Sequence, residues 1–305
     1  MSKGNYNRIV AFLDILGFSR LVENSSPMQV VRAFHEIFSS ILISRYREIQ
    51  NEIVELALVP DSKEQAKPLF EKLKYASSIL SKDGTVESKD ELDTFLKGIF
   101  PFHYMIVSDS IIVYSDVVVE NTNIVDVFEE FVVFVRHLVV SSLLRRLPLR
   151  GAISFGEFYV DDRNSIYFGK SLLDAIKLEK QQNWIGCIIS ENLNDIIADY
   201  LSTRSFPIPK QIVPTLRHIH PLAGHTINRY PVPLHKKPPM EAFIVNWYGA
   251  LIGKIQLNDG FFDSELTGIP SIDVKYRNTL QYMKWWHSAL ESILLQTSET
   301  GLKIT

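Results

Sequence analysis

The spacing of apolar and polar residues predicts an alternation of strands and helices. Ser26-Pro27 is typical of a helix N-cap followed by a first-turn proline, and apolar residues recur behind it at three- and four-residue steps. The tightly joined apolar runs around Ser108-Asp109-Ser110 predict a hairpin with an acid at its tip. Strands are expected at residues 9–16, in the hairpin over 102–114, and at 150–160, 187–190 and 243–247. Helices are expected at about 28–58, 125–147, 170–180, 191–201 and 271–295.

Two stretches depart from this alternation. Residues 60–98 are rich in Lys, Asp, Glu and Ser, and we expect a mostly helical insertion there, on the surface. Eight of the fourteen prolines lie between Pro207 and Pro239, which excludes a long helix and favours extended edges and loops. We therefore divide the chain into a domain over 1–200, with the insertion inside it, and a segment 201–305 that completes the same domain.

The element order predicts an α+β fold. A strand, a helix, a hairpin, a second helix and a strand give the ferredoxin-like βαββαβ pattern, here with a C-terminal extension. The chain has 305 residues, of which 46% are hydrophobic and 22% charged, enough to bury a sizeable core.

Charge and composition exclude several classes of protein. Lys plus Arg is 32 and Asp plus Glu is 35, a net charge of −3 that gives no footprint for nucleic acid or an anionic membrane. The most apolar stretch, 125–144, carries five ionisable residues, so it predicts a buried helix and not a membrane span. Cys187 is the single cysteine, which excludes an intrachain disulfide and favours a cytoplasmic protein without a leader segment.

The strongest candidate for chemistry is a pair of acids inside apolar surroundings, Asp14 and Asp109. An unpaired carboxylate is costly in such a place. The two acids either cap loops or pair with arginine, or they converge from neighbouring strands to bind divalent metal. Oxygen ligands suit Mg²⁺ or Mn²⁺, with phosphates of a substrate completing the coordination.

Four motifs around these acids resemble those of class III nucleotide cyclases. They are the segment Phe12-Leu-Asp-Ile-Leu-Gly-Phe-Ser19, the Ser108-Asp109 turn, the strand Arg150-Gly-Ala-Ile-Ser-Phe-Gly156, and the helix start Phe168-Gly-Lys-Ser-Leu-Leu-Asp-Ala-Ile-Lys-Leu-Glu179. More narrowly, the second and third motifs are similar to those of the pyrimidine cyclases of Pycsar antiphage systems. The resemblance implies the class III nucleotidyl cyclase fold and a homodimer with sites at its interface.

The resemblance also implies roles for single residues. Asp14 and Asp109 would bind two Mn²⁺ or Mg²⁺ ions, with the main-chain carbonyl of Ile15 as a further ligand. Arg150 would contact the triphosphate; the alternative is a strand-end arginine paired with a surface acid. The segment around Asp14 would bind substrate through Phe12, Gly17 and Phe18, and the backbone amides after Asp14, through Phe18, could cradle phosphates.

Other positions depart from the family pattern. The helix Asn and Arg are replaced by Leu173 and Lys177, and the purine-reading Lys and its acidic partner by Met105 and Ile166. This agrees with pyrimidine substrates and equally with loss of activity. Candidates to contact the base are His103, Tyr104 and Met105 on one strand, and Tyr46 and Arg47 on the long helix.

Lys237, beside Lys236, either reaches phosphates from the partner subunit or forms a solvated basic turn. Our leading interpretation is a cyclase that converts UTP to cyclic UMP, with CTP as the next choice, and whose product acts on a separate effector. The alternatives are a degenerate cyclase fold that binds nucleotide without turnover, and another two-metal phosphoryl enzyme such as a nuclease, which the charge disfavours.

Overall fold

The computed structural model describes residues 6–57, 100–119, 121–203, 226–251 and 262–299, together with positions 67, 70, 71 and 74. The insertion expected at about 60–98 and the first part of the proline-rich stretch lie almost wholly outside the described residues. Within the described part, no helix is both long and apolar enough to cross a bilayer.

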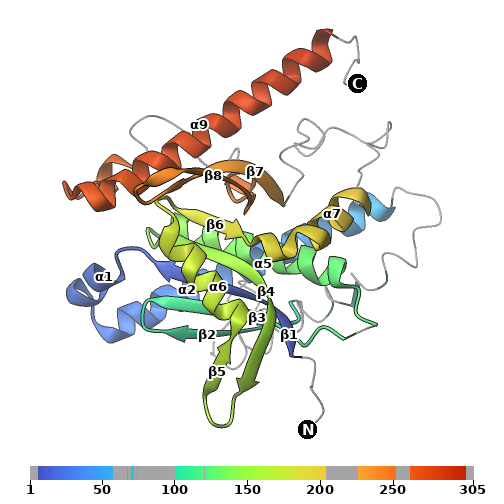
Figure 1. Ribbon diagram of the computed structural model, residues 1–305, viewed down its shortest axis with the longest axis horizontal. Helices are drawn as coiled ribbons and strands as arrows, with labels where there is room; N and C mark the ends of the chain where they lie inside the picture. The colour runs from blue at the N-terminus through green and yellow to red at the C-terminus, as the bar shows by residue number, and fades with distance from the viewer. Residues whose placement is uncertain are drawn as a thin grey trace.

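The fold is a mixed α+β structure built on one eight-stranded sheet (Figure 1). The strands are β1 (Asn7–Ile15), β2 (Phe102–Val107), β3 (Ser110–Ser115), β4 (Leu149–Asp161), β5 (Ile166–Gly169), β6 (Gly186–Ile189), β7 (Ile227–Leu234) and β8 (Lys237–Val245). The α-helices are α1 (Phe18–Asn24), α2 (Pro27–Ala57), α5 (Ile124–Leu144), α6 (Lys170–Gln181), α7 (Asn194–Thr203) and α9 (Pro270–Glu299).

The predicted βαββαβ order is present. It runs β1, α2, β2, β3, α5, β4, and the four strands lie side by side as β2-β3-β1-β4 with antiparallel pairing throughout. The extension continues this sheet, because β6 pairs in parallel with β4, and β8 and β7 follow on its far side. The α+β prediction is therefore confirmed.

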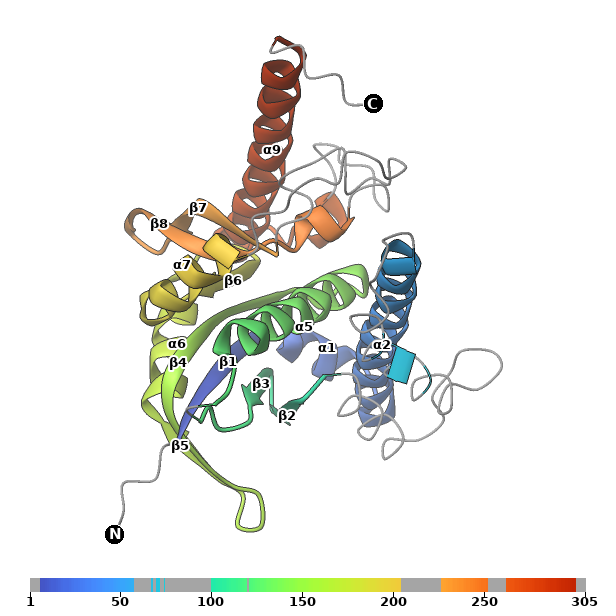
Figure 2. The same ribbon diagram turned by 90° about the vertical axis from the view of Figure 1, so that its right-hand side faces the viewer.

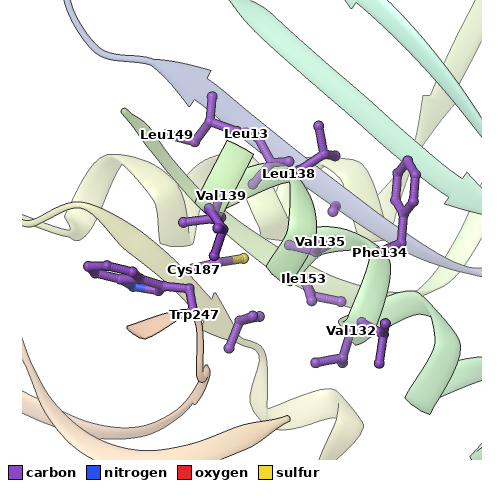
Figure 3. Packing of buried hydrophobic residues seen from close by; sticks show 14 of the residues in the cluster. Leu13, Val132, Phe134, Val135, Leu138, Val139, Leu149, Ile153, Cys187 and Trp247 are labelled. Atoms are coloured by element: carbon purple, nitrogen blue, oxygen red, sulfur yellow. The ribbon is translucent and has the colours of Figure 1, made fainter. Parts of the chain in front are cut away.

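Alternation along β1 separates two faces of the sheet. Ile9, Ala11, Leu13 and Ile15 are buried in the main core, which α2 and α5 cover from one side. Figure 3 shows α5 side chains such as Leu138 and Val139 packed beside Leu13, Leu149 and Cys187. The intervening residues of β1 point the other way, toward α6, which lies on the opposite side in Figure 2.

Helix α9 lies across the C-terminal strands (Figure 1). Its Tyr282 and Trp286 are fully buried, and both donate to the side-chain oxygen of Asn246 next to β8, at 3.3 and 3.1 Å. The Tyr282 ring also packs edge-on against Trp184 and Tyr230. These aromatic contacts fix the first half of α9 to the body of the protein.

Several boundaries differ from the sequence-based expectation. Helix α1 and strand β5 were not predicted, because seven and four residues are too short to show a period. Strand β8 begins at Lys237 and not at 243. Only Phe243 and Ile244 of β8 pair with β6, so the prolines at 238 and 239 lie in a part of the strand that pairs with β7 alone, where a missing N–H is tolerated. Helix α7 begins at Asn194, after a 3₁₀ turn over Glu191–Leu193.

Candidate functional site

Asp14 and Asp109 lie side by side at one end of the sheet. Asp14 is the penultimate residue of β1 and stands opposite Ser110, the first residue of β3. The backbone N–H of Ile15 donates to the carbonyl oxygen of Asp109 at 2.7 Å. Ser108 adopts a positive φ of 57°, which turns the chain tightly from β2 into β3 at this point. The hairpin with an acid at its tip is thus present, and it brings the two predicted acids together.

The charge of Asp14 is incompletely balanced in this position. Burial raises the pKa of Asp14, the nearby Arg150 guanidinium lowers it, and the negative charge of Asp109 raises it again. The net effect is a pKa above the ordinary value for aspartate. Ionised Asp14 would therefore be stabilised by a further cation bound between the two carboxylates.

The donors at this end of the sheet fit a metal ion that a substrate helps to coordinate. Among the described residues there is no cluster of three or more His, Cys, Asp or Glu side chains that would form a closed cage. Mg²⁺ is usually held by one or two carboxylates, with waters and substrate phosphates as the other ligands. Asp14, Asp109 and the main-chain oxygen of Ile15 are the residues that would hold such an ion.

Arg150 is the cross-strand neighbour of Asp14 on β4. Its Nη2 lies 3.5 Å from Oδ2 of Asp14, its Nε donates to Glu179 at 2.5 Å, and its Nη1 donates to the carbonyl oxygen of Gln182 at 3.3 Å. The residue is only 8% exposed. The guanidinium is therefore engaged inside the protein, where it holds Asp14, and the structure does not present it as a free contact for the triphosphate.

Glu179 is a site residue that the sequence analysis quoted in a motif but gave no role. It projects from α6 and is 2% exposed, in an ion pair with Arg150. Burial raises the pKa of Glu179, and the charge of Arg150 partly offsets that effect. The signal in the sequence was an acid on the buried face of a predicted helix, with an arginine at the start of β4.

Lys275 is a second site residue that the sequence analysis missed. It belongs to the first turns of α9, and its positive charge acts on both Asp14 and Glu179. Nothing in the sequence pairs residue 275 with residue 14, because only the docking of α9 on the sheet brings them near each other.

The predicted base-contacting residues divide between the two faces of β2. His103 and Met105 stand opposite Tyr114 and Ile112 and share the Asp14 side of the sheet. His103 stacks on Tyr114, with 5.0 Å between ring centroids, and its Nε2 lies 3.0 Å from Oδ1 of Asp116. Tyr104 points to the other face, where it stacks on Phe38 in the main core. His103 and Met105 therefore share the Asp14 side of the sheet, and Tyr104 does not lie on that side.

The segment around Asp14 is held by backbone hydrogen bonds. The amide of Ile15 is bonded to Asp109, and the amide of Leu16 donates to Pro148 at 2.9 Å. The expected phosphate cradle would therefore use the amides that follow, at Gly17 and Phe18. Gly17 has a φ of 82°, a conformation that favours glycine, and precedes α1. Phe12 lies on the α6 side in the second apolar cluster, and Phe18 packs against Phe34 in the main core.

Four predicted substrate contacts lie away from Asp14 within one chain. Tyr46 packs against the main core from α2, on the opposite side of the sheet, and Arg47 is exposed on the same helix. Lys177 is exposed on α6, where it lies 3.6 Å from Asp174. Lys237 is exposed at the start of β8, after a turn in which Lys236 has a φ of 54°. A direct role for these residues requires contributions from a second subunit.

No protein-family model matches the chain, and the search of curated proteins returned no match. Among solved structures, the chain is similar to the crystal structure of the adenylyl cyclase CyaB from P. aeruginosa, with 14% identity, a TM-score of 0.35, and coverage of 83% of this chain and 95% of that one. This neighbour is distant, and at that TM-score the similarity carries no argument about activity.

Proposed function

We propose that the chain is a nucleotide cyclase, which converts a nucleoside triphosphate to a 3′,5′-cyclic nucleotide and diphosphate. The observation that carries the proposal is the placement of Asp14 and Asp109 at one end of neighbouring strands, with the charge of Asp14 incompletely balanced. The four motifs that resemble class III cyclases contribute the reaction type.

In this reaction the ribose 3′-oxygen attacks the α-phosphorus, and the bond from that phosphorus to the β-phosphate oxygen breaks. The 3′-hydroxyl proton is lost and diphosphate leaves, so no oxidant or co-reactant is needed. Two Mn²⁺ or Mg²⁺ ions, when bound, lower the pKa of the 3′-hydroxyl and neutralise phosphate charge. Asp14, Asp109 and the Ile15 carbonyl would hold them, while Arg150 and Glu179 keep the Asp14 carboxylate in position.

The proposed substrate is a pyrimidine nucleotide, UTP first and CTP second. Met105 and Ile166 occupy the positions where the resemblance expects the purine-reading pair, and neither has a side chain that pairs with a purine edge. Met105 and His103 lie on the Asp14 face, so a base bound along β2 meets an apolar side chain and an imidazole nitrogen. With Nε2 of that imidazole donating to Asp116, Nδ1 of the neutral ring is an acceptor, which suits the N3–H of uracil.

We further propose a homodimer. Large apolar side chains are exposed on the sheet and on α6: Val107 near Asp109 on the hairpin, and Ile166, Phe168 and Leu173 on β5 and α6, each between 45% and 59% exposed. Strand β5 pairs with the end of β4 that is remote from Arg150. Exposed apolar groups of this size are typical of interfaces. A second subunit would also supply the residues that lie away from Asp14, such as Lys177 and Lys237. As in Pycsar systems, the cyclic product would act on a separate effector in antiphage defence.

The alternative is a nucleotide-binding module without turnover. The observation in its favour is that Arg150 is occupied by Glu179 and Gln182 and that Leu173 stands where the family has a polar residue. Incubating the purified protein with each of four nucleoside triphosphates and Mn²⁺, followed by chromatography, separates the two: a cyclic product supports the cyclase, and bound but unchanged nucleotide supports the module.

A further inference from the structure

We propose that Lys275, in the first turns of α9, binds phosphate oxygens of the substrate at the Asp14 site. This inference rests on the proposed function for the identity of the substrate. It makes the C-terminal helix part of the site and gives it a task that no motif in the sequence indicates.

Lys275 occupies an unusual place on α9. It begins a stripe of residues spaced by four, three and four, in which Thr279, Tyr282 and Trp286 are all fully buried. Residues at this spacing share one face of a helix. A lysine on the buried face of an amphipathic helix is directed at the protein and not at solvent, and Lys275 is itself partly buried.

Hydrogen bonds on the same face position the lysine over the end of α6. Asn278 donates to the carbonyl oxygen of Asn183 at 2.6 Å, and Thr279 accepts from the amide of Ile185 at 2.8 Å. The residue before Asn183 is Gln182, whose carbonyl oxygen accepts from Arg150 at 3.3 Å. Gln182 therefore binds the Arg150 guanidinium, and the next residue, Asn183, binds α9. These two contacts place the turn of α9 that carries Lys275 beside the pair formed by Arg150 and Asp14.

The start of α9 is also fixed. Asp273 accepts hydrogen bonds from the amides of Thr267 and Gly268, at 2.8 and 3.0 Å, and from the Thr267 hydroxyl at 3.1 Å. Asp273 is 5% exposed, so the loop before the helix is tied down from within. Lys275 lies two residues after Asp273 and shortly before Asn278 and Thr279, so hydrogen bonds fix the helix backbone on both sides of it.

The charges agree with this placement. The ammonium of Lys275 lowers the pKa of Asp14 and of Glu179, while burial and the Arg150 charge lower the pKa of Lys275 itself. Within the part of the chain that the structure describes, the Lys275 ammonium has no carboxylate at ion-pair distance, whereas Arg150 is held by Asp14 and Glu179. Lys180 also acts on Asp14, but it is exposed at the end of α6. Of the two partly or fully buried cations, Arg150 and Lys275, Lys275 is the one whose donors are available, and a bound phosphate would compensate its partial burial.

The test uses inorganic tripolyphosphate with Mg²⁺ as the probe, titrated calorimetrically into the full chain. Lys275→Met should weaken binding by about ten- to a hundredfold, as expected for the loss of a charge-assisted contact, and Lys275→Arg should retain most of it. Lys284→Met, a lysine exposed further along α9, is the matched control and should bind as the parent does. If Lys275→Met does not fold, Lys275→Gln replaces it, with thermal unfolding as the check.

The outcomes separate this inference from the proposed function. Equal affinity in the parent and in Lys275→Met, or no binding by the parent, would overturn the inference whether or not the protein is a cyclase. If no nucleotide is cyclised while tripolyphosphate binding still depends on Lys275, the cyclase proposal fails and the anion site stands. If the protein is a cyclase, Lys275→Met should raise KM for the triphosphate more than it lowers kcat.

Discussion

Asp14 and Arg150 are direct cross-strand neighbours on β1 and β4, with 3.5 Å between Oδ2 and Nη2. The other side of the same guanidinium is held by Glu179 from α6, which is almost completely buried. This chain of contacts links the end of β1 to α6 through one arginine. These contacts hold the Asp14 carboxylate in position near Asp109.

Arg150 and Glu179 should therefore be strongly coupled in stability. Arg150→Met leaves the buried Glu179 charge uncompensated and should lower the free energy of unfolding by about 3–5 kcal/mol. The double variant Arg150→Met/Glu179→Leu removes both charges and should recover most of that loss. Urea unfolding of the two single variants and the double variant measures the coupling, and simple addition of the two losses would contradict the pairing.

The two acids are expected to be essential for turnover and dispensable for folding. Asp14→Asn and Asp109→Asn should each lower kcat by about a hundredfold or more, because each removes a charge from the metal site. Circular dichroism should stay that of the parent, since Arg150 keeps Glu179 as its partner. Asp199→Asn, at an exposed acid on α7, is the control and should be fully active. Full activity in either site variant would remove the two-metal assignment.

A second charged network holds α2 against α5. Glu48 accepts from Arg136 at 3.2 Å and from His137 at 3.0 Å, and pairs with Arg45 at 3.5 Å. Because these partners are largely buried, Glu48→Gln should lower the free energy of unfolding by about 2–3 kcal/mol. Glu36, also on α2, is half exposed and pairs with the exposed Arg32 and, at 3.8 Å, with Arg145 at the end of α5, so Glu36→Gln should change the free energy of unfolding by about 0.5 kcal/mol or less.

The same network predicts a loss of stability in acid. The charges of His137, Arg136 and Arg45 hold the pKa of Glu48 well below its ordinary value of 4.5, despite burial, so the stabilisation is present above that value and is lost as pH falls further. Burial holds the pKa of His137 below 6.5, so the unfolded chain takes up that proton first and stability already declines below about pH 6.5. Urea midpoints at pH 7, 5.5 and 4 should fall in that order; a flat profile would argue against this network.

The apolar surface on β5 and α6 should form the dimer interface. A charge on this surface, introduced by Phe168→Asp or Leu173→Asp, should shift the protein to monomers in sedimentation velocity and remove turnover. Leu201→Asp, at an exposed leucine on α7, should leave the dimer intact. A parent protein that is monomeric at micromolar concentration and still active would exclude the proposed dimer.

Strong periodicity and turn chemistry made most of the fold predictable. The runs that became β1, α2, the β2–β3 hairpin, α5 and β4 each have a clear period or a clear turn, and their order indicates the βαββαβ core. The sequence did not predict the short elements α1 and β5 or the bounds of the proline-containing strands β7 and β8. In these segments the contacts within the sheet, and not the local sequence, determine the secondary structure.

The site was predictable only where the residues follow one another along strands. Asp14 and Asp109 could be paired because hairpin and strand ends meet at one edge of a sheet. Arg150 is engaged inside the protein because it pairs with Glu179. Glu179 was part of a motif, but the sequence did not show that it contacts Arg150. Lys275 reaches the site through tertiary docking of α9, and no spacing in the sequence reports that.

The most direct test of the central claim is product analysis with four nucleotides. The purified protein, Asp14→Asn and Asp109→Asn are each incubated with ATP, GTP, CTP or UTP and Mn²⁺, with and without EDTA, and the products are resolved by chromatography. We expect the parent to release diphosphate and a 3′,5′-cyclic nucleotide, cyclic UMP before cyclic CMP, and both variants and the EDTA sample to release none. Preferential formation of cyclic AMP or cyclic GMP would contradict the pyrimidine assignment, and the absence of any cyclic product from the folded parent would contradict the cyclase itself.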